Sequence, residues 1–233
     1  VEADPIALRE ALARVSYAAA KNRIDAPYLN GVLLDSENAV ASDGHRIALT
    51  PIAGFKAWHI VPAQAIRYCE AALGRGTRIA AGAGEIAIEN EDSSIRARLL
   101  DAKWPDYKRM VPTPDTFTSV FRFAADEMTD AINRILPLCT DYERVVLEVE
   151  KDVLRLSPDR DTDTLDIVPG ERTKGESEMR VGLYSRYLLD VLRQAHGDPV
   201  SWRHKGEFEV QAFTFGAYDK QRADLHYIMP VKL

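Results

Sequence analysis

Cysteine is scarce in this 233-residue sequence, which has only two, and the common metal-binding and nucleophile motifs are missing. Cys69 and Cys139 form no C-x-x-C pair, and no two of the five histidines have H-E-x-x-H spacing, so we expect no metal site. The G-x-S-x-G elbow of hydrolases and the G-x-x-x-x-G-K-[ST] phosphate loop are absent as well. The sequence therefore indicates no metal and no cofactor.

Two stretches come nearest to a ligand-binding loop. Aspartates alternate over 159–166 as at the start of a calcium loop, but Thr164 stands where that loop needs glycine and Gly170 where it needs glutamate. The glycine-rich stretch 74–85 has no Lys-Ser/Thr pair and continues into strand patterns. We interpret both stretches as turns.

The sequence also lacks long apolar segments. No run of about 18 apolar residues could span a bilayer. Residues 1–10 have neither the basic nor the apolar region of a secretory signal. Both cysteines fall in apolar helical patterns, where a free thiol is a small core residue, and this usage fits a reducing compartment. We expect a cytoplasmic protein with no membrane contact.

An excess of positive charge is missing too, because the formal net charge is -6. Residues 1–112 hold 14 basic and 14 acidic side chains, so the remaining 16 basic and 22 acidic residues carry the whole imbalance. This argues against a protein that binds nucleic acid over its whole surface. A local basic face remains possible, because the local field attracts phosphate.

What the sequence does contain is a repeated pattern of helices and strands. Three prolines between 103 and 114 separate two strand-rich halves, each with two helices, which predicts two α+β domains at 1–112 and 113–233. Helical spacing of apolar residues occurs at 5–20, 62–73, 126–136 and 185–197. Strand patterns occur at 28–36, 38–44, 45–52, 57–61, 84–92, 93–101, 118–124, 144–158, 178–184, 207–215 and 223–233.

The tetrapeptide Asp43-Gly44-His45-Arg46 brings together residue types that serve in catalysis. Neighbours on a strand point to opposite faces, whereas the members of a catalytic triad usually come from separate elements. Taken alone, the tetrapeptide is more typical of a turn with a hydrogen-bonded histidine. A hydrolase that uses His45 and a carboxylate is the minority hypothesis.

Five ordered motifs point to a family. YLNGVLLD, ASDGHRIAL, WPDYKRMVP, YSRYLLDVL and the terminal YIMPVKL together resemble the middle and C-terminal domains of the bacterial DNA polymerase III β subunit, the sliding clamp. No segment corresponds to the N-terminal domain of that family. The resemblance implies two clamp domains in a ring around duplex DNA, with helices lining the hole and antiparallel sheets outside. It implies a processivity factor that is not an enzyme.

In this family, polymerases, the clamp loader and repair proteins insert a short linear peptide into an apolar cleft between domains. The matching positions here combine apolar, adaptable side chains with rim donors. They are Leu29, Ser42, Gly44, His45, Arg46, Ile47, Pro105, Arg109, Met110, Tyr187, Met229, Pro230, Val231, Lys232 and Leu233.

The helices also supply basic residues for non-sequence-specific contact with duplex DNA. The residues that we expect to face DNA are Arg9, Arg14, Lys21, Arg67, Arg134, Arg186 and Arg193. Solvated surface is the alternative for any one of them, but as a set they would form a sparse positive lining that permits sliding.

Some positions depart from the family pattern. Ala26 replaces a common arginine beside the cleft, Val231-Lys232 replace a more usual Met-Arg, and Glu207 and Glu209 fall on a strand that usually adds small or apolar residues. We therefore expect the pocket itself, but not the peptide preference of the family, to carry over to this chain.

Assembly is the last expectation. Two domains per chain suggest a closed homotrimer, because six domains form the ring in related clamps, and Leu138 is a candidate subunit contact. Pro137, beside it, departs from the family pattern. The alternative is a clamp-like fragment or decoy that binds clamp-binding peptides without forming a ring.

Overall fold

The protein is described here by a computed structural model that covers residues 2–82, 84–140, 143–151, 153–159, 165–175, 178–216 and 223–232. The chain forms two compact units. The first unit comprises residues 1–110 and 220–224, and the second comprises 111–219 and 225–233. Both units combine helices with antiparallel sheets, so the predicted α+β class is confirmed.

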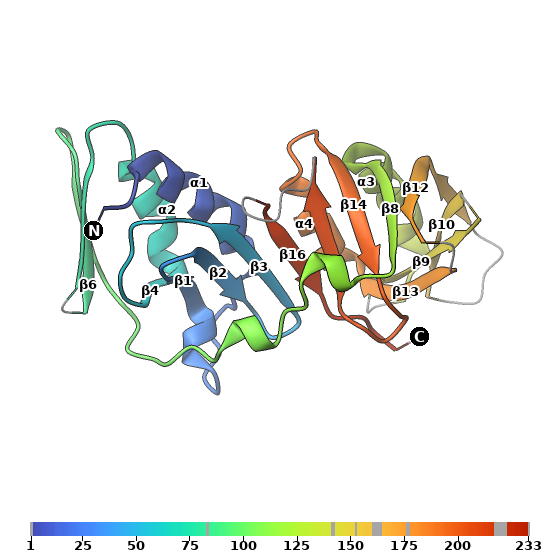
Figure 1. Cartoon of the computed structure of the whole chain (residues 1–233), viewed down its shortest axis with the longest axis horizontal. Coiled ribbons are helices and arrows are strands. Elements are labelled where there is room, and N and C mark those ends of the chain that lie inside the picture. Colours follow the sequence, from blue (N-terminus) through green and yellow to red (C-terminus); the bar gives the residue numbers. More distant parts are fainter. Residues whose placement is uncertain are drawn as a thin grey trace. The chain divides into compact units, whose positions relative to one another are not determined.

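In the first unit, two helices pack on one face of an antiparallel sheet with the strand order β3-β2-β1-β4 (Figure 1). A second, three-stranded sheet has the order β5-β6-β7. The helices are α1 (Pro5–Val15) and α2 (Ala63–Ala72). The strands are β1 (Gly31–Leu34), β2 (Asn38–Ser42), β3 (Arg46–Pro51), β4 (His59–Pro62), β5 (Arg78–Gly82), β6 (Glu85–Glu89) and β7 (Ser94–Arg98).

Helix α1 shows how the local sequence sets an element's ends. The Asp4 carboxylate caps the helix by accepting a hydrogen bond from the Ile6 amide at 3.2 Å. Leu8, Leu12 and Val15 form the buried stripe that faces the sheet. The helix ends at Val15, sooner than the predicted residue 20. A 3-10 turn follows at Ser16–Ala18, after which the chain is extended and the Ala20 amide donates to the Leu29 carbonyl at 2.8 Å.

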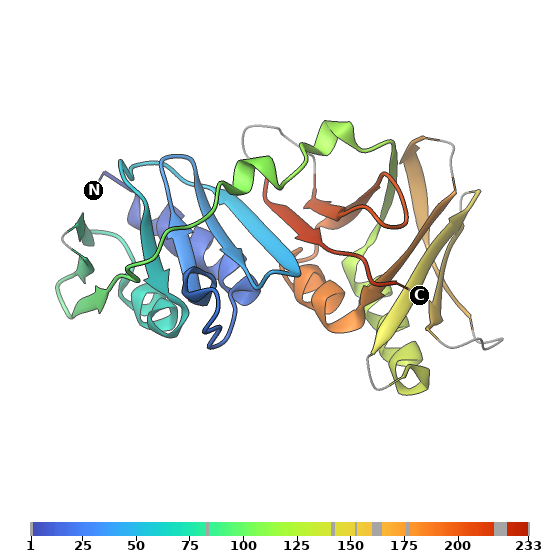
Figure 2. The ribbon, with the colours of Figure 1, turned by 90° about the horizontal axis from the view of Figure 1, so that it is seen from below.

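The second unit has the same plan. Its helices α3 (Ala125–Ile135) and α4 (Ser185–Arg193) pack against each other and against two antiparallel sheets, as Figure 2 shows from a second direction. The strand orders within this unit are β12-β8-β14-β15-β16 and β11-β10-β9-β13. The strands are β8 (Ser119–Ala124), β9 (Arg144–Glu150), β10 (Val153–Pro158), β11 (Asp166–Val168), β12 (Gly170–Lys174), β13 (Met179–Tyr184), β14 (Pro199–His204), β15 (Gln211–Phe215) and β16 (Leu225–Ile228).

One predicted strand of the second unit is wrong in its extent. The strand expected at 207–215 begins only at Gln211, and residues 205–210 form the turn that follows the unpredicted strand β14. The buried Gln211 side chain holds this turn, because its amide nitrogen donates to the carbonyls of Gly206 at 3.0 Å and Glu209 at 2.6 Å. Its amide oxygen accepts from the Trp202 indole at 2.8 Å.

The predictions for 74–85 and for 144–184 agree with the structure only in part. The hairpin predicted at 144–158 is confirmed by the pairing of β9 with β10. The predicted turn within 159–166 lies mostly at 160–164, outside the described residues. Strands β5, β11 and β12 were not predicted, and the interpretation of 74–85 as a turn is wrong in part, because β5 lies within it and pairs with β6.

A buried hydrogen-bond network fixes the segment that follows β7. The Tyr107 hydroxyl donates to the Asp35 carboxylate at 2.8 Å and accepts from the Asn38 side-chain amide at 3.0 Å. Both Tyr107 and Asp35 are buried, and burial raises the pKa of the phenol. The network therefore ties the segment to the β1–β2 turn.

We expect Tyr107→Phe to lower the free energy of unfolding by about 1–2 kcal/mol, because the buried Asp35 carboxylate loses a donor. Urea unfolding measures the difference. Tyr68→Phe is the matched control, because Tyr68 is half exposed on α2 and its effect should stay within about 0.5 kcal/mol. Equal effects of the two substitutions would contradict a stabilising role for the network.

Candidate functional site

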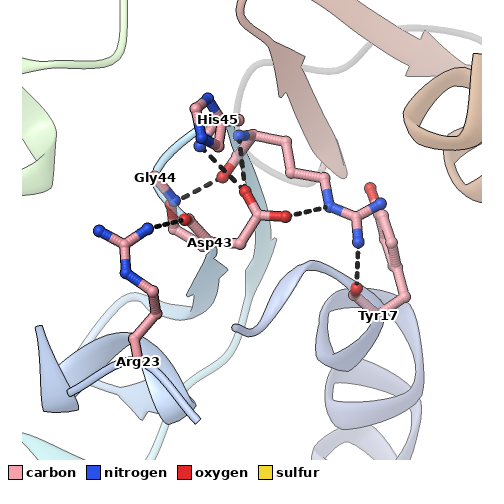
Figure 3. A network of polar contacts seen from close by, with 7 residues as sticks. Tyr17, Arg23, Asp43, Gly44 and His45 are labelled. Carbon is pink, nitrogen blue, oxygen red and sulfur yellow. Dashed lines mark hydrogen bonds and ion pairs between the residues drawn. The ribbon is translucent and has the colours of Figure 1, made fainter. Parts of the chain in front are cut away.

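The tetrapeptide 43–46 forms the turn between β2 and β3 (Figure 3). One carboxylate oxygen of Asp43 accepts from the backbone amides of His45 at 2.9 Å and Arg46 at 3.1 Å. Gly44 has φ +93, a left-handed conformation that favours glycine. The aspartate and the glycine are therefore turn-forming residues.

Arg46 anchors this turn to the end of the first helical segment. Its Nε donates to the second carboxylate oxygen of Asp43 at 3.0 Å, and its Nη2 donates to the Tyr17 carbonyl at 2.8 Å. The guanidinium carbon also lies 5.0 Å from the centroid of the Tyr17 ring. Because the Asp43 carboxylate is engaged by its own turn, the arrangement does not favour a hydrolase that pairs Asp43 with His45.

An apolar residue and a second arginine lie beside the turn. A Cβ added to Gly44 would lie 3.9 Å from a Leu29 methyl carbon and 3.6 Å from Arg23 Nη1. The structure thus brings Leu29 and Gly44 together, as the motifs suggest. It adds Arg23, which sequence reasoning missed although Arg23 lies only three residues before the departure at Ala26. Ala26 itself is buried.

The remaining predicted site residues of the first unit differ in exposure. Ile47 follows Arg46 on β3 and is partly buried, whereas Pro105, Arg109 and Met110 are exposed. Arg109 forms an ion pair with Asp106 at 3.2 Å. The Tyr107 network lies within this stretch and sets the position of its backbone.

In the second unit, the terminal segment adds to strand β13. The Val231 amide donates to the Gly182 carbonyl at 2.9 Å, and Arg144 Nη1 donates to the Lys232 carbonyl at 3.5 Å. Met229 is 48% exposed, and Pro230 is partly buried. Leu233 lies outside the described residues.

Tyr187 is largely buried, with 7% of its surface exposed, as is Leu29 of the first unit, with 6%. Its ring meets Tyr184 edge-on at 5.6 Å between centroids, and the Arg186 guanidinium lies 5.0 Å from the Tyr187 centroid. The Tyr187 ring therefore packs against neighbouring side chains.

The predicted DNA-facing residues fall into two groups. Arg14, Arg134 and Arg193 form ion pairs with Asp224, Asp166 and Asp190 respectively. The Arg134 pair is 2.6 Å long and holds the pKa of Asp166 below its usual value. The other four predicted residues are exposed and have no ion pair with another described residue: Arg9, Lys21, Arg67 and Arg186.

Acidic side chains on the helices weaken the positive field. Helix α3 carries Asp126, Glu127 and Asp130 but only one arginine, Arg134.

The residue proposed for subunit contact, Leu138, is half exposed in the 3-10 turn Leu136–Leu138 that follows α3.

Among the described residues, no group of three or more His, Cys, Asp or Glu side chains could hold a metal ion. The described helices are all too short or too polar to cross a bilayer.

Comparison with known proteins adds a family assignment. A family model described as the central domain of the DNA polymerase III beta subunit matches residues 3–106. The beta sliding clamp of Escherichia coli K12 is 30% identical over 183 residues, which cover 71% of this chain and 48% of that protein. The chain belongs to the bacterial sliding clamp family. It spans about half the length of the curated sliding clamps that it matches.

Solved clamp structures share the fold of the chain. A sliding clamp from Pseudomonas aeruginosa aligns with a TM-score of 0.86 at 22% identity, over 99% of this chain and 66% of that one. A Pseudomonas aeruginosa clamp bound to griselimycin aligns equally well, at 23% identity over 99% of this chain and 64% of that one. Both units therefore have the fold of clamp domains.

Proposed function

We propose that this chain is a DNA sliding clamp, a processivity factor that encircles duplex DNA and tethers a replicative polymerase, a clamp loader and repair proteins. Family membership carries the proposal. The Asp43–Arg46 turn supports a non-enzymatic role, because its carboxylate stabilises a loop rather than activating a nucleophile. Such a protein works on cytoplasmic DNA and needs no cofactor.

The proposal assigns 1–112 to the central clamp domain and 113–233 to the C-terminal clamp domain. The repeated plan of two helices packed on antiparallel sheets supports this assignment. Helices α1 to α4 then line the hole, and the sheets form its outer wall.

The same proposal assigns peptide binding to two sets of residues. In the first unit, Leu29 lies next to Gly44 of the Arg46-anchored turn. Met110 is exposed, three residues after Tyr107, whose side chain is fixed by hydrogen bonds. In the second unit, the segment 229–232 is joined to β13 by the bridge between Val231 and Gly182, and Met229 is exposed. Adaptable apolar surface flanked by fixed polar groups suits a short linear peptide.

The test of the peptide site is titration calorimetry with a clamp-binding peptide, one with a glutamine followed by aliphatic and aromatic residues. Binding should weaken at least tenfold in Leu29→Ala, because a buried anchor side chain contributes about 2 kcal/mol to binding. Ile79→Ala, which removes a buried side chain from β5 of the three-stranded sheet, is the matched control and should bind as the wild type does. Equal weakening in both variants would point to general destabilisation.

DNA binding gives a separate test. We expect the triple variant Arg9→Ala, Arg67→Ala and Arg186→Ala to bind DNA with a weaker salt dependence. The slope of log affinity against log salt should become less steep by about three units, one for each arginine that no longer binds a phosphate. The matched control replaces Arg78, Arg96 and Arg155, which lie on sheet strands. Filter binding to duplex DNA over a range of salt concentrations measures both slopes. An unchanged slope in the helix variant would contradict the assignment of these helices to the hole.

A further inference from the structure

The loop before the first site motif has a fixed backbone at Arg23. The Arg23 amide donates to the Asn30 side-chain oxygen at 2.7 Å, and the Asn30 side-chain nitrogen donates back to the Arg23 carbonyl at 2.8 Å. Asn30 is the asparagine of the YLNG motif. The same motif that supplies Leu29 therefore also positions Arg23.

The Arg23 guanidinium is oriented by two different partners. Its Nη1 donates to the Asp43 carbonyl at 3.2 Å, which holds the group against the β2–β3 turn, as Figure 3 shows. Its Nε and Nη2 donate to the two carboxylate oxygens of Asp25 at 2.8 and 2.7 Å. A planar two-donor edge of this kind matches a carboxylate in geometry as well as in charge.

The two partners differ in how firmly they are held. The Asp43 carbonyl belongs to the anchored turn, whereas the Asp25 side chain is 70% exposed and neighbours Ile24, which is 93% exposed. The Arg23 side chain is 39% exposed, so solvent reaches the pair and screens it. Displacement of the Asp25 carboxylate from Arg23 by the carboxylate of a ligand would therefore cost little free energy.

We propose that Arg23 determines peptide specificity by binding an acidic side chain of the incoming peptide, and that Asp25 occupies this position in the free protein. This inference rests on the proposed peptide site. The guanidinium lies beside the surface formed by Leu29 and Gly44, because a Cβ on Gly44 would be within 4 Å of both Arg23 Nη1 and a Leu29 methyl carbon. A peptide whose apolar side chain packs on the exposed Gly44, next to the largely buried Leu29, places its flanking residue near Arg23.

The position of Ile24 adds to the argument. Ile24 is exposed and lies between Arg23 and Asp25 in the chain. It can therefore contact the aliphatic part of a peptide glutamate that takes the place of the Asp25 carboxylate at Arg23. The pKa of Asp25 lies below its usual value because Arg23 donates hydrogen bonds to it, so the position favours the ionised form of a carboxyl group.

The experiment compares clamp-binding peptides that carry Glu or Gln at each position flanking the aliphatic anchor, by titration calorimetry. We expect the wild type to prefer one Glu peptide over its Gln partner by about three- to tenfold. Arg23→Gln should remove this preference while the Gln peptide binds as before. Asp25→Asn should increase the preference, because the internal competitor has no charge in that variant.

The matched control is Arg96→Gln, which alters an arginine of the same unit that pairs with Glu85 and Glu89 on the three-stranded sheet. It should keep the wild-type preference. A wild type without any Glu preference, or an Arg23→Gln variant that retains it, would overturn the assignment of Arg23. If no peptide binds the wild type at all, the proposed peptide site itself fails, and the two failures are thereby distinguished.

Discussion

Deletion of Met229 to Leu233 should abolish binding of a clamp-binding peptide. The deletion removes the exposed Met229 side chain and the Val231 backbone, whose amide donates to Gly182 at 2.9 Å. Removal of one anchor side chain typically costs about 2 kcal/mol of binding free energy, and the deletion removes several together, so we expect affinity to fall by more than about a hundredfold. Titration calorimetry with the full-length and shortened chains measures the difference.

Two controls separate an effect on peptide binding from an effect on folding. The shortened chain should keep a cooperative thermal transition, because strand β16 ends at Ile228 and the five-stranded sheet of the second unit remains complete. Met229→Ala keeps the backbone and should weaken binding by an intermediate amount. Equal affinity of the full-length and shortened chains would move the peptide site away from this segment.

Local sequence was enough to predict the elements that rest on local interactions. The Asp4 cap, the buried stripe of α1 and the hairpin of β9 and β10 each follow from residues close together in the chain. The β2–β3 turn is similar, because Asp43 hydrogen-bonds to amides only two and three residues away. The sequence alone could therefore favour a turn over a catalytic site for the tetrapeptide 43–46.

Strand β14 could not be identified in this way. Its sequence, 199–204, begins with a proline and mixes apolar with polar residues, and its strand conformation comes from pairing with β8 and β15 on either side. The turn at 205–210 depends on the buried Gln211 side chain, which bonds to Gly206 and Glu209. The alternation of residue types over 207–215 indicated a strand over the whole range. It could not show that the Gln211 side chain would bond to the backbone of 206–209 and hold it in a turn.

The electrostatics of the helices depend on ion pairs that sequence spacing does not reveal. Arg14 pairs with Asp224, which is 210 residues away, and Arg134 pairs with Asp166 across 32 residues. A basic residue on the expected face of a helix can thus be neutralised by a distant carboxylate. Similarly, Arg23 became a candidate only when its distance from Gly44 was known.

The chain should form a trimer in solution. Four domains would enclose too small a hole for hydrated duplex DNA, whereas three chains of two domains close a ring of six. Among the described strands, β5 pairs only with β6 and β11 only with β10, so the β5-β6-β7 sheet and the β11-β10-β9-β13 sheet each have an edge strand that could pair with another copy. Head-to-tail pairing of these two different edges, β5 of one copy with β11 of the next, closes a cyclic ring and covers both edges. Light scattering at micromolar concentration should give about three times the chain mass of 26.0 kDa.

Leu138 provides the variant that tests this assembly. It is half exposed after α3, and α3 packs against β11, so the residue lies in the part of the second unit that carries an open edge. Leu138→Ser should shift the scattering mass toward 26.0 kDa, because the substitution weakens all three interfaces of a cyclic trimer at once. Tyr68→Ser is the matched control, since it removes a comparably exposed apolar side chain from α2 and should leave the trimer intact. A wild-type chain that stays monomeric at every concentration would contradict the ring and favour a clamp-like protein that binds peptides without encircling DNA.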